Sequence, residues 1–519
     1  MSENEKFFKH ITEGYTTKGD FIVMGAAMLE GETITNAHVK IPLKTLNRHG
    51  LIAGATGTGK TVTLQVLAEN LSEKGVPVLL MDIKGDLSGI AQPGEEKPFI
   101  TERHQKIGLP FETKKFPVEL LSLSEEKGVR MRATVSEFGP ILLSRILDLS
   151  DVQSGILSII FKYCDDTHLP LLDLKDLKKI LQYSTDHGKE KFEKEYGRIS
   201  TTSTGAILRK IVELEQQGAD LFFGERSFNP EDLLRLDENG SGYINILRLT
   251  DIQDRPKLFS TFMLCLLAEI YATFPEQGDS EKPKLVLFIE EAHLIFNEAT
   301  KPLLNQIESI IKLIRSKGVG IFFVTQNPTD VPDAVLSQLG LKVQHALRAF
   351  TAKDRKAIKL SAENYPISEY YKTDEVLTSL GIGEAFISAL NEKGIPTPLA
   401  ATMLRAPMGR MGILNEEEIS KVVTNSKLAQ KYNEIIDRES AYELLNQKIA
   451  RAEEADAIEK ARRERVATSR HSSGRTPNYG NGRTRTTTTS RTDQNPLIKI
   501  LSSPTVIRSV LGILGKMLK

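Results

Sequence analysis

The eight residues GATGTGKT, at positions 54–61, constrain this chain more than any other stretch. They follow the short apolar run 51–53 and precede a stretch with the apolar period of a helix, so the pattern is strand, glycine loop, helix. They match G-x-x-x-x-G-K-[ST] at every fixed position. Glycines there let backbone N–H groups turn toward a phosphate, which a side chain would obstruct. The stretch therefore predicts a phosphate-binding loop at the start of a helix, whose amide groups favour an anion.

Two side chains of this loop have predicted roles in nucleotide binding. Lys60 can reach the β- and γ-phosphate oxygens, and the Thr61 hydroxyl can ligate Mg²⁺. ATP and Mg²⁺ are accordingly the predicted cofactors. The residues that we expect to bind the nucleotide are Gly54, Ala55, Thr56, Gly57, Thr58, Gly59, Lys60 and Thr61, with position 62 after them.

An acidic pair ends the apolar run LVLFIEE. We expect Glu290 to hold the Mg²⁺ shell and Glu291 to polarise the attacking water as general base. A nucleotide kinase or GTPase does not need a base beside the magnesium acid. The pair therefore favours an ATPase of the RecA-like type, with an additional strand in its sheet. The alternative is two solvated glutamates at the end of a strand.

Polar residues that follow other apolar runs are further candidates. Gln326, after FFVT, is a candidate sensor of the γ-phosphate, or else a turn residue before Pro328. Asp82 ends VPVLLMD and either contacts metal or water, or caps a helix or loop. For His293, a capping or core role is at least as well supported as a catalytic one.

Phosphoryl transfer gains from an arginine near the γ-phosphate, which a neighbouring subunit often provides. The candidates are Arg315, Arg348 and Arg48, although an arginine in any one of these contexts is more often a surface or ion-pair residue. We favour Arg315, because it follows a long predicted helix and precedes the predicted sensor strand, where a subunit edge would lie.

Composition excludes several classes of protein. The 519 residues are too many for one ordinary core, and the 40% apolar and 26% charged content is that of a soluble globular protein. The net charge is zero, so attraction to nucleic acid would need a local patch. The two cysteines match no metal spacing and are expected to be small buried apolar residues in a reducing compartment. The N-terminus lacks an apolar signal core, and no run approaches the ~20 apolar residues of a membrane span. A cytoplasmic protein without integral membrane association is expected.

Alternating strand and helix patterns predict an α/β fold: a RecA-like P-loop core with a mainly parallel sheet, a helical insertion, and a helical, partly disordered C-terminal tail. We expect seven segments: a short N-terminal β segment at 1–45, the first part of the core at 46–97, a mainly helical insertion at 98–240, the second part of the core at 241–410, helices at 411–467, a low-complexity linker at 468–495, and an amphipathic helix at 496–519.

Four blocks in order carry a resemblance to a known family: LNRHGLIAGATGTGKT, MDIKGDLSG, FIEEAH and IRSKGVGIFFVTQNP. Over roughly residues 20–410 the chain resembles the HerA/FtsK branch of P-loop ATPases, and within it the bacterial YjgR-type HerA-like proteins. The resemblance implies ATP hydrolysis and a hexameric ring, and raises DNA translocation as an activity. Many HerA-like proteins have Asp-Glu where this chain has Glu290 and Glu291. The segment before the P-loop strand is shorter than the family's N-terminal barrel, so the resemblance does not extend to barrel-dependent partners such as a nuclease.

Two uses of the released energy stay open. One is a ring-shaped motor on double-stranded DNA, and residues 451–519, with 14 Lys and Arg against 6 Asp and Glu, offer a basic tail for phosphates. The other is an ATP-driven protein-remodelling or assembly factor without DNA contact, whose final amphipathic segment docks on a subunit, a partner or a membrane surface.

Overall fold

The strands of the described chain pair into one mixed sheet that carries the predicted loop. The computed structural model describes residues 2–471, except 253, 254, 279, 299, 300, 350, 435 and 437. The sheet order is β2 (Glu32–Pro42), β1 (Phe21–Leu29), β12 (Ala400–Leu404), β11 (Glu384–Ser388), β10 (Leu341–His345), β3 (Gly50–Ala53), β9 (Val319–Thr325), β8 (Leu285–Ile289), β4 (Val78–Asp82), β7 (Ile244–Arg248), β5 (Val118–Ser122) and β6 (Val129–Arg130).

The strands from β10 to β6 in this order are parallel, whereas β2, β1, β12 and β11 extend the sheet with antiparallel pairs. Strands β3, β4, β8 and β9 are buried at every residue. Such continuous apolar strands are typical of parallel sheets that are covered on both faces. The predicted α/β fold with a mainly parallel sheet is confirmed.

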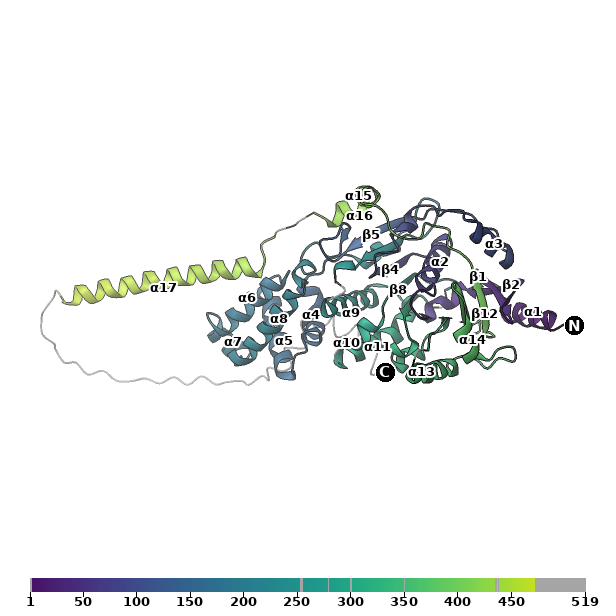
Figure 1. Ribbon diagram of the computed structural model, residues 1–519. Coiled ribbons are helices and arrows are strands. Elements are labelled where there is room, and N and C mark those ends of the chain that lie inside the picture. Colours follow the sequence, from purple (N-terminus) through teal and green to yellow (C-terminus); the bar gives the residue numbers. More distant parts are fainter. Residues whose placement is uncertain are drawn as a thin grey trace. The chain divides into compact units, whose positions relative to one another are not determined.

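Helices cover both faces of the parallel strands (Figure 1). Leu64 and Leu67 of α2 (Lys60–Glu73) share one buried core with Phe322 of β9. On the other face, Phe296 of α10 (His293–Glu298) packs against Phe323 of β9, with ring centroids 5.3 Å apart. Neighbouring residues of a strand point to opposite faces, so these contacts place α2 and α10 on opposite sides of β9.

The remaining helices of this part of the chain connect strands or flank the sheet. They are α1 (Glu3–Gly14), α3 (Pro98–Ile107), α9 (Pro256–Thr273), α11 (Lys301–Ile314), α12 (Asp333–Leu336), α13 (Ala352–Glu363), α14 (Thr373–Ser379), α15 (Glu416–Thr424) and α16 (Lys427–Tyr432). None of the helices among the described residues combines the length and apolar character that a membrane span requires.

The N-terminal segment 1–45 contains a helix as well as the expected strands. Helix α1 begins at a reciprocal cap in which the Glu5 N–H donates to the Ser2 hydroxyl and the Ser2 N–H donates to the Glu5 carboxylate. It buries Phe7 and Ile11 in the same core as α2. The prediction of strands and turns alone was wrong here, because the capping pair and the two apolar positions one turn apart were overlooked.

The helical insertion is narrower than the predicted range 98–240. Strand β5 is a short apolar run that pairs with β7, so this part of the range belongs to the sheet. Of the described residues, the sheet-bearing unit comprises those in 2–133, 217–222 and 226–435, and the helical unit those in 134–216, 223–225 and 436–471. The helical unit contains α4 (Val135–Ile146), α5 (Asp151–Thr167), α6 (Leu174–Thr185), α7 (Lys189–Glu195), α8 (Thr201–Gln216) and α17 (Ala441–His471).

Local signals explain two features of the helical unit. The apolar period over 141–166 breaks into α4 and α5, because Ser150 caps α5 through the N–H of Gln153. Helix α17 is joined to α6 where the Tyr442 N–H donates to the buried Asp176 carboxylate, at 2.8 Å. The predicted C-terminal helices 411–467 therefore fall into both units, with α15 and α16 in the sheet-bearing one.

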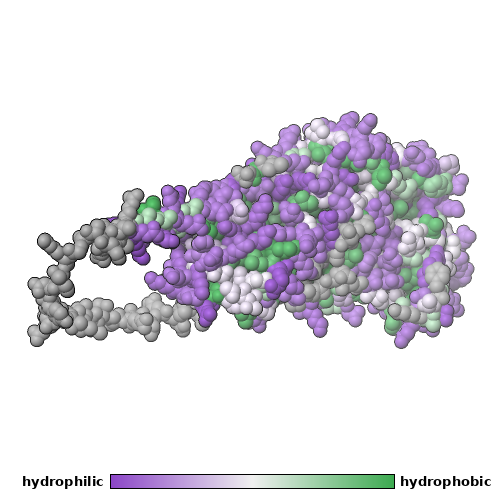
Figure 2. Space-filling view, turned by 60° about the vertical axis from the view of Figure 1, so that its left-hand side comes forward, coloured by the Kyte–Doolittle hydropathy of each residue, from purple (hydrophilic) through white to green (hydrophobic). Residues whose placement is uncertain are grey.

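The predicted C-terminal tail falls almost wholly outside the described residues. Of the low-complexity range 468–495 only the first residues are described, at the end of α17, and 496–519 lies beyond them. Of the two cysteines, Cys164 is buried as predicted and Cys265 is partly exposed. The face drawn in Figure 2 is mainly hydrophilic, with small separate hydrophobic areas among its coloured residues.

Candidate nucleotide site

The carboxyl ends of four neighbouring parallel strands bring the predicted residues together. Strand β9 lies between β3, which leads into the glycine loop, and β8, which leads into Glu290. Strand β4, ending at Asp82, pairs with the other edge of β8. The strand between the loop strand and the acidic strand is the additional strand that the acidic pair predicted. Ligands of open α/β sheets bind at this edge, beyond the carboxyl ends of the strands.

The glycine loop has the open backbone that its composition predicts. Gly54, Gly57 and Gly59 all have positive φ angles, of 153°, 77° and 107°. A Cβ atom on Gly54 would lie 2.5 Å from Cβ of His345, so this position has no room for a side chain. A Cβ on Gly57 would meet nothing within 4 Å, because the loop there faces open space. The backbone thus surrounds a space that a phosphate group can enter.

Lys60 and Thr61 lie at the first turn of α2, as predicted. The Lys60 amine donates to the carbonyl oxygens of Gly54 and Ala55, at 2.7 and 3.1 Å, so it folds back over its own loop. Burial, and next the charge of Lys84, lower the pKa of Lys60. The Thr61 hydroxyl lies 3.5 Å from Oε1 of Glu290. Thr61 therefore faces the acidic strand end, whereas the Lys60 amine lies over the loop.

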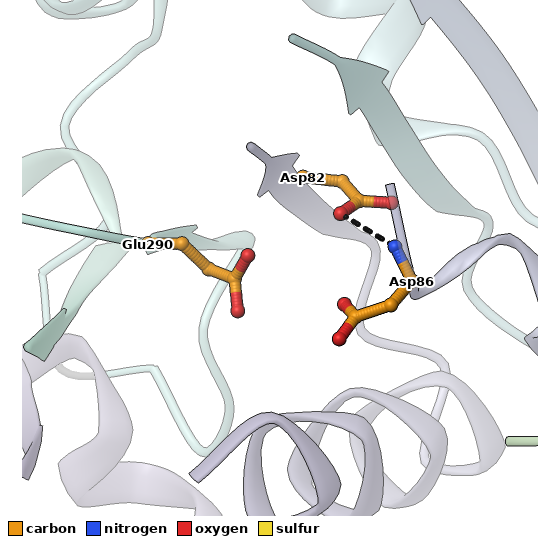
Figure 3. Close-up of side chains that lie close together, drawn as sticks. All are labelled: Asp82, Asp86 and Glu290. Atoms are coloured by element: carbon orange, nitrogen blue, oxygen red, sulfur yellow. Dashed lines mark hydrogen bonds between the residues drawn. The ribbon is translucent and has the colours of Figure 1, made fainter. Parts of the chain in front are cut away.

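Glu290 forms a carboxylate cluster with Asp82 and Asp86. Each of the three offers one oxygen within 4.8 Å of the others, and Figure 3 shows their side chains turned toward a common space. Asp82 is held by backbone N–H groups of Gly85, Asp86 and Leu87, at 2.7, 3.1 and 3.1 Å. Burial, and next the charge of Asp82, raise the pKa of Glu290 to about 8. Burial is likewise the main reason that the pKa of Asp82 is raised to about 6.

This cluster suits a hard divalent cation. Among the described residues, Oε2 of Glu290 and Oδ1 of Asp86 are buried oxygens without a hydrogen-bond partner, and Glu290 is only 1% exposed. Buried carboxylates of like charge repel each other unless protons or a cation neutralise them. Carboxylate and hydroxyl oxygens are the ligands that Mg²⁺ takes in proteins. The residues present therefore fit the cation that accompanies a nucleotide's phosphates.

Glu291 reaches the same edge because the chain bends there. Its φ angle is 45°, a left-handed conformation that is uncommon for residues other than glycine. Glu290 points into the carboxylate cluster, whereas Glu291 forms an ion pair with Lys84 at 2.9 Å. Its other oxygen lies 3.3 Å from Nδ1 of His293. Neighbouring residues of a regular strand point to opposite faces of the sheet, and the bend at Glu291 allows both glutamates to line the site.

The other predicted residues separate into two groups. Gln326 directly follows β9, whose Thr325 carbonyl accepts the N–H of Gly54, so this residue lies at the edge of the site. Arg315 lies in the short 3₁₀ turn before β9, at the opposite, amino end of the strands, and is exposed. Arg48 lies at that amino end as well, just before β3, and Arg348 follows β10, where its guanidinium donates to the Thr378 carbonyl. Arg315 cannot act on the glycine loop of its own chain.

An apolar cavity of about 170 Å³ lies beside the glycine loop. Phe99 and Ile382, which are 60% and 72% exposed, line it together with Met411. Arg103 closes one side, where its guanidinium donates to carbonyl oxygens of Ile382, Gly383 and Leu404. Gly59 is part of the lining, so the cavity begins where the phosphate loop ends.

Sequence reasoning missed several residues of this site. Asp86 and Lys84 lie in MDIKGDLSG, which begins with the last two residues of β4. A second acid four residues after Asp82 was a signal that could have been used. Phe99 carries no such signal, because it belongs to a segment far from the loop in sequence. Only the packing of α3 near Gly59 makes it part of the site.

The fold and the site together define the class: a RecA-like P-loop nucleotide-binding protein. The plasmid coupling protein TrwB, solved in complex with ADP and Mg²⁺, is similar in fold, with a TM-score of 0.50 and 15% identity over 79% of this chain and 95% of that one. At this identity the likeness supports the fold.

The family follows from sequence comparison. The family model described as helicase HerA-like C-terminal matches residues 27–519, and the chain belongs to this family. The DNA double-strand break repair helicase HerA of Sulfolobus acidocaldarius is 22% identical over 369 residues, which cover 68% of this chain and 64% of the relative. The DNA import protein CedB of the same organism is 24% identical over 364 residues, or 69% and 52%. The chain thus spans less than two thirds of these relatives. The predicted resemblance to the HerA/FtsK branch is confirmed.

Proposed function

We propose that this protein is an ATP hydrolase that works as a ring-shaped motor on double-stranded DNA. The observation that carries hydrolysis is the pair of glutamates after β8, in which Glu290 lies beside Thr61 and Glu291 faces the same edge. A nucleotide-binding protein without hydrolysis needs only the first of these acids.

Each residue has a role that its position permits. The N–H groups of the loop and the Lys60 amine bind the β- and γ-phosphates, for which Lys60 leaves the carbonyl oxygens of Gly54 and Ala55. Thr61, Glu290, Asp82 and Asp86 hold Mg²⁺, which when bound neutralises charge on the phosphate oxygens. Glu291 accepts a proton from the attacking water, and the water oxygen forms its bond to the γ-phosphorus as the bond to ADP breaks.

The apolar cavity beside Gly59 is the proposed site of the adenine base. A base has two apolar faces, and aromatic side chains stack on such faces. Phe99 and Ile382 provide the apolar surfaces, and the cavity adjoins the phosphate loop, as one nucleotide requires.

A ring and a DNA substrate are the finer parts of this proposal. Two relatives are a DNA double-strand break repair helicase and a DNA import protein, and the chain matches part of each. Arg315 is exposed and lies away from its own loop, which suits a residue that completes the site of a neighbouring subunit. Gln326 is the proposed γ-phosphate sensor. The small number of cysteines supports a reducing, cytoplasmic location, which fractionation of cells would test.

The alternative function also uses ATP hydrolysis, but its substrate is a protein and not DNA. The net charge of the chain is zero, so the chain as a whole has no electrostatic attraction to nucleic acid. An ATP-driven protein-remodelling factor is therefore the alternative proposal.

One experiment separates these possibilities. The ATP hydrolysis rate is measured at fixed salt with and without duplex DNA, for the wild type and for Lys60→Ala. We expect Lys60→Ala to abolish hydrolysis, and turnover retained in this variant would refute the assigned site. Stimulation by DNA, with binding that weakens as salt rises, supports the motor. Hydrolysis without stimulation or DNA binding refutes the motor and leaves the protein-remodelling alternative. A mass measurement with nucleotide tests the ring.

A further inference from the structure

The carboxylate of Glu291, the proposed general base, forms an ion pair with the ammonium group of Lys84 in the structure. The Lys84 amine lies 2.9 Å from Oε1 of Glu291, and the two side chains are 42% and 13% exposed. His293 lies on the other carboxylate oxygen, at 3.3 Å. The left-handed backbone of Glu291 is a conformation that persists only where the surroundings hold it. A general base has to face the attacking water, whereas this carboxylate faces Lys84 and His293.

The turn that carries Lys84 is held by backbone hydrogen bonds, whereas the Lys84 side chain can rotate about its own bonds. The turn after β4 is tied to Asp82, whose carboxylate accepts the N–H groups of Gly85, Asp86 and Leu87. The lysine amine is a compact charge at the end of a flexible four-carbon side chain. Lys84 can therefore change its partner without any change in this turn.

A second partner for Lys84 becomes available when ATP binds. Lys60 marks the place of the β- and γ-phosphates, because it is the lysine of the phosphate loop. Lys84 lies on Glu291 at 2.9 Å, and the preceding Glu290 lies 3.5 Å from Thr61, the residue after Lys60, so Lys84 and the phosphate loop face the same edge of the sheet. A terminal phosphate placed beside Lys60 would therefore attract Lys84 as well, and it carries more negative charge than one carboxylate.

We propose that Lys84 is a positioning residue that exchanges Glu291 for the γ-phosphate of ATP. While the site is empty or holds ADP, Lys84 holds Glu291 away from water. When the γ-phosphate arrives, Lys84 moves to it, and Glu291 becomes available to the attacking water. The exchange makes the base dependent on the presence of the group that it helps to hydrolyse. This inference rests on the proposed ATP hydrolysis.

A double-mutant cycle on nucleotide affinity tests the exchange. The dissociation constants of a non-hydrolysable ATP analogue and of ADP are measured for the wild type, Lys84→Met, Glu291→Gln and the double variant. Direct effects of each side chain on the phosphate cancel in the cycle, which leaves the change in the Lys84–Glu291 interaction on binding. We expect Glu291→Gln to improve affinity for the ATP analogue more when Lys84 is present than when it is replaced by Met. The two effects should differ about three- to fivefold, which is the range for a partly exposed ion pair. With ADP we expect no such difference.

The controls distinguish a failure of the proposed Lys84 exchange from a failure of the proposed ATP hydrolysis. The pair Lys372–Glu375, at 3.2 Å on the surface, provides a matched cycle through Lys372→Met and Glu375→Gln, which should be additive with both nucleotides. Lys84→Gln repeats the test with a polar side chain. An additive Lys84–Glu291 cycle with the ATP analogue would mean that Lys84 stays on Glu291, and would overturn the exchange. Absence of nucleotide binding in the wild type would overturn the proposed function itself.

Discussion

Replacing the buried Glu69 should change how the stability of the protein depends on pH. Glu69 lies on α2, two turns after the phosphate loop, and is 0% exposed. Its carboxylate accepts the N–H groups of Met408 and Gly409, at 2.6 and 3.0 Å, and the Gln65 amide at 2.8 Å. These bonds fasten the segment that lines the proposed base cavity to the helix of the phosphate loop.

The magnitude follows from the pKa of Glu69, which burial raises from 4.5 to about 7 against the hydrogen bonds to Met408, Gln65 and Gly409. The folded state thus binds the proton more tightly than the unfolded state does. As pH rises through 4.5 toward 7, the unfolded chain ionises first, so this group lowers the free energy of unfolding. One pKa unit is worth about 1.4 kcal/mol, so above pH 7 the ionisation of Glu69 has lowered the free energy of unfolding by about 3 kcal/mol in total. About 2 kcal/mol of it falls between pH 5 and pH 8.

Glu69→Gln removes the titrating group while keeping one acceptor oxygen. Urea unfolding of the wild type and the variant is compared at pH 5 and pH 8. Between pH 5 and pH 8, we expect the free energy of unfolding of the wild type to fall by about 2 kcal/mol more than that of the variant. This difference does not depend on the absolute stability of the variant. Glu73→Gln, one turn further along α2 in a surface ion pair with Lys114, should show no such change. An equal difference at both pH values would refute the buried, proton-linked role of Glu69.

Three further outcomes are expected. Asp86→Asn should weaken Mn²⁺ binding, followed by electron paramagnetic resonance, about tenfold with nucleotide present, because the cluster loses a charged ligand; unchanged affinity would remove Asp86 from the cation site. Phe99→Ala should weaken binding of a fluorescent ATP analogue by about 1 kcal/mol, roughly fivefold, and of inorganic triphosphate not at all; an equal loss for both would refute the base cavity. Arg315→Ala should lower kcat about a thousandfold, and mixing it with Glu291→Gln subunits should restore part of the activity; no recovery at any ratio would argue against a shared site.

Much of the parallel core could be predicted because its signals are local. The apolar runs that became β3, β4, β8 and β9 were recognisable, and so was the helix after the glycine loop. The cap at Ser2 and the break before Ser150 were equally local but depend on single polar side chains, which an apolar period does not reveal. The boundary of the helical unit was missed for another reason. Whether β5 joins the sheet depends on its distant partner β7.

The sequence by itself determined which chemical groups are available for the proposed reaction. A loop of glycines with Lys60 and Thr61, and a strand that ends in Glu290 and Glu291, are short-range patterns, because backbone freedom and side-chain type are properties of the residues themselves. Only the tertiary structure decided which groups act together. It brought Asp86 to Glu290 and Lys84 to Glu291, across two paired strands that lie about two hundred residues apart in the chain. The physical reason is that a sheet orders strands by pairing, and their order in space is independent of their order in sequence.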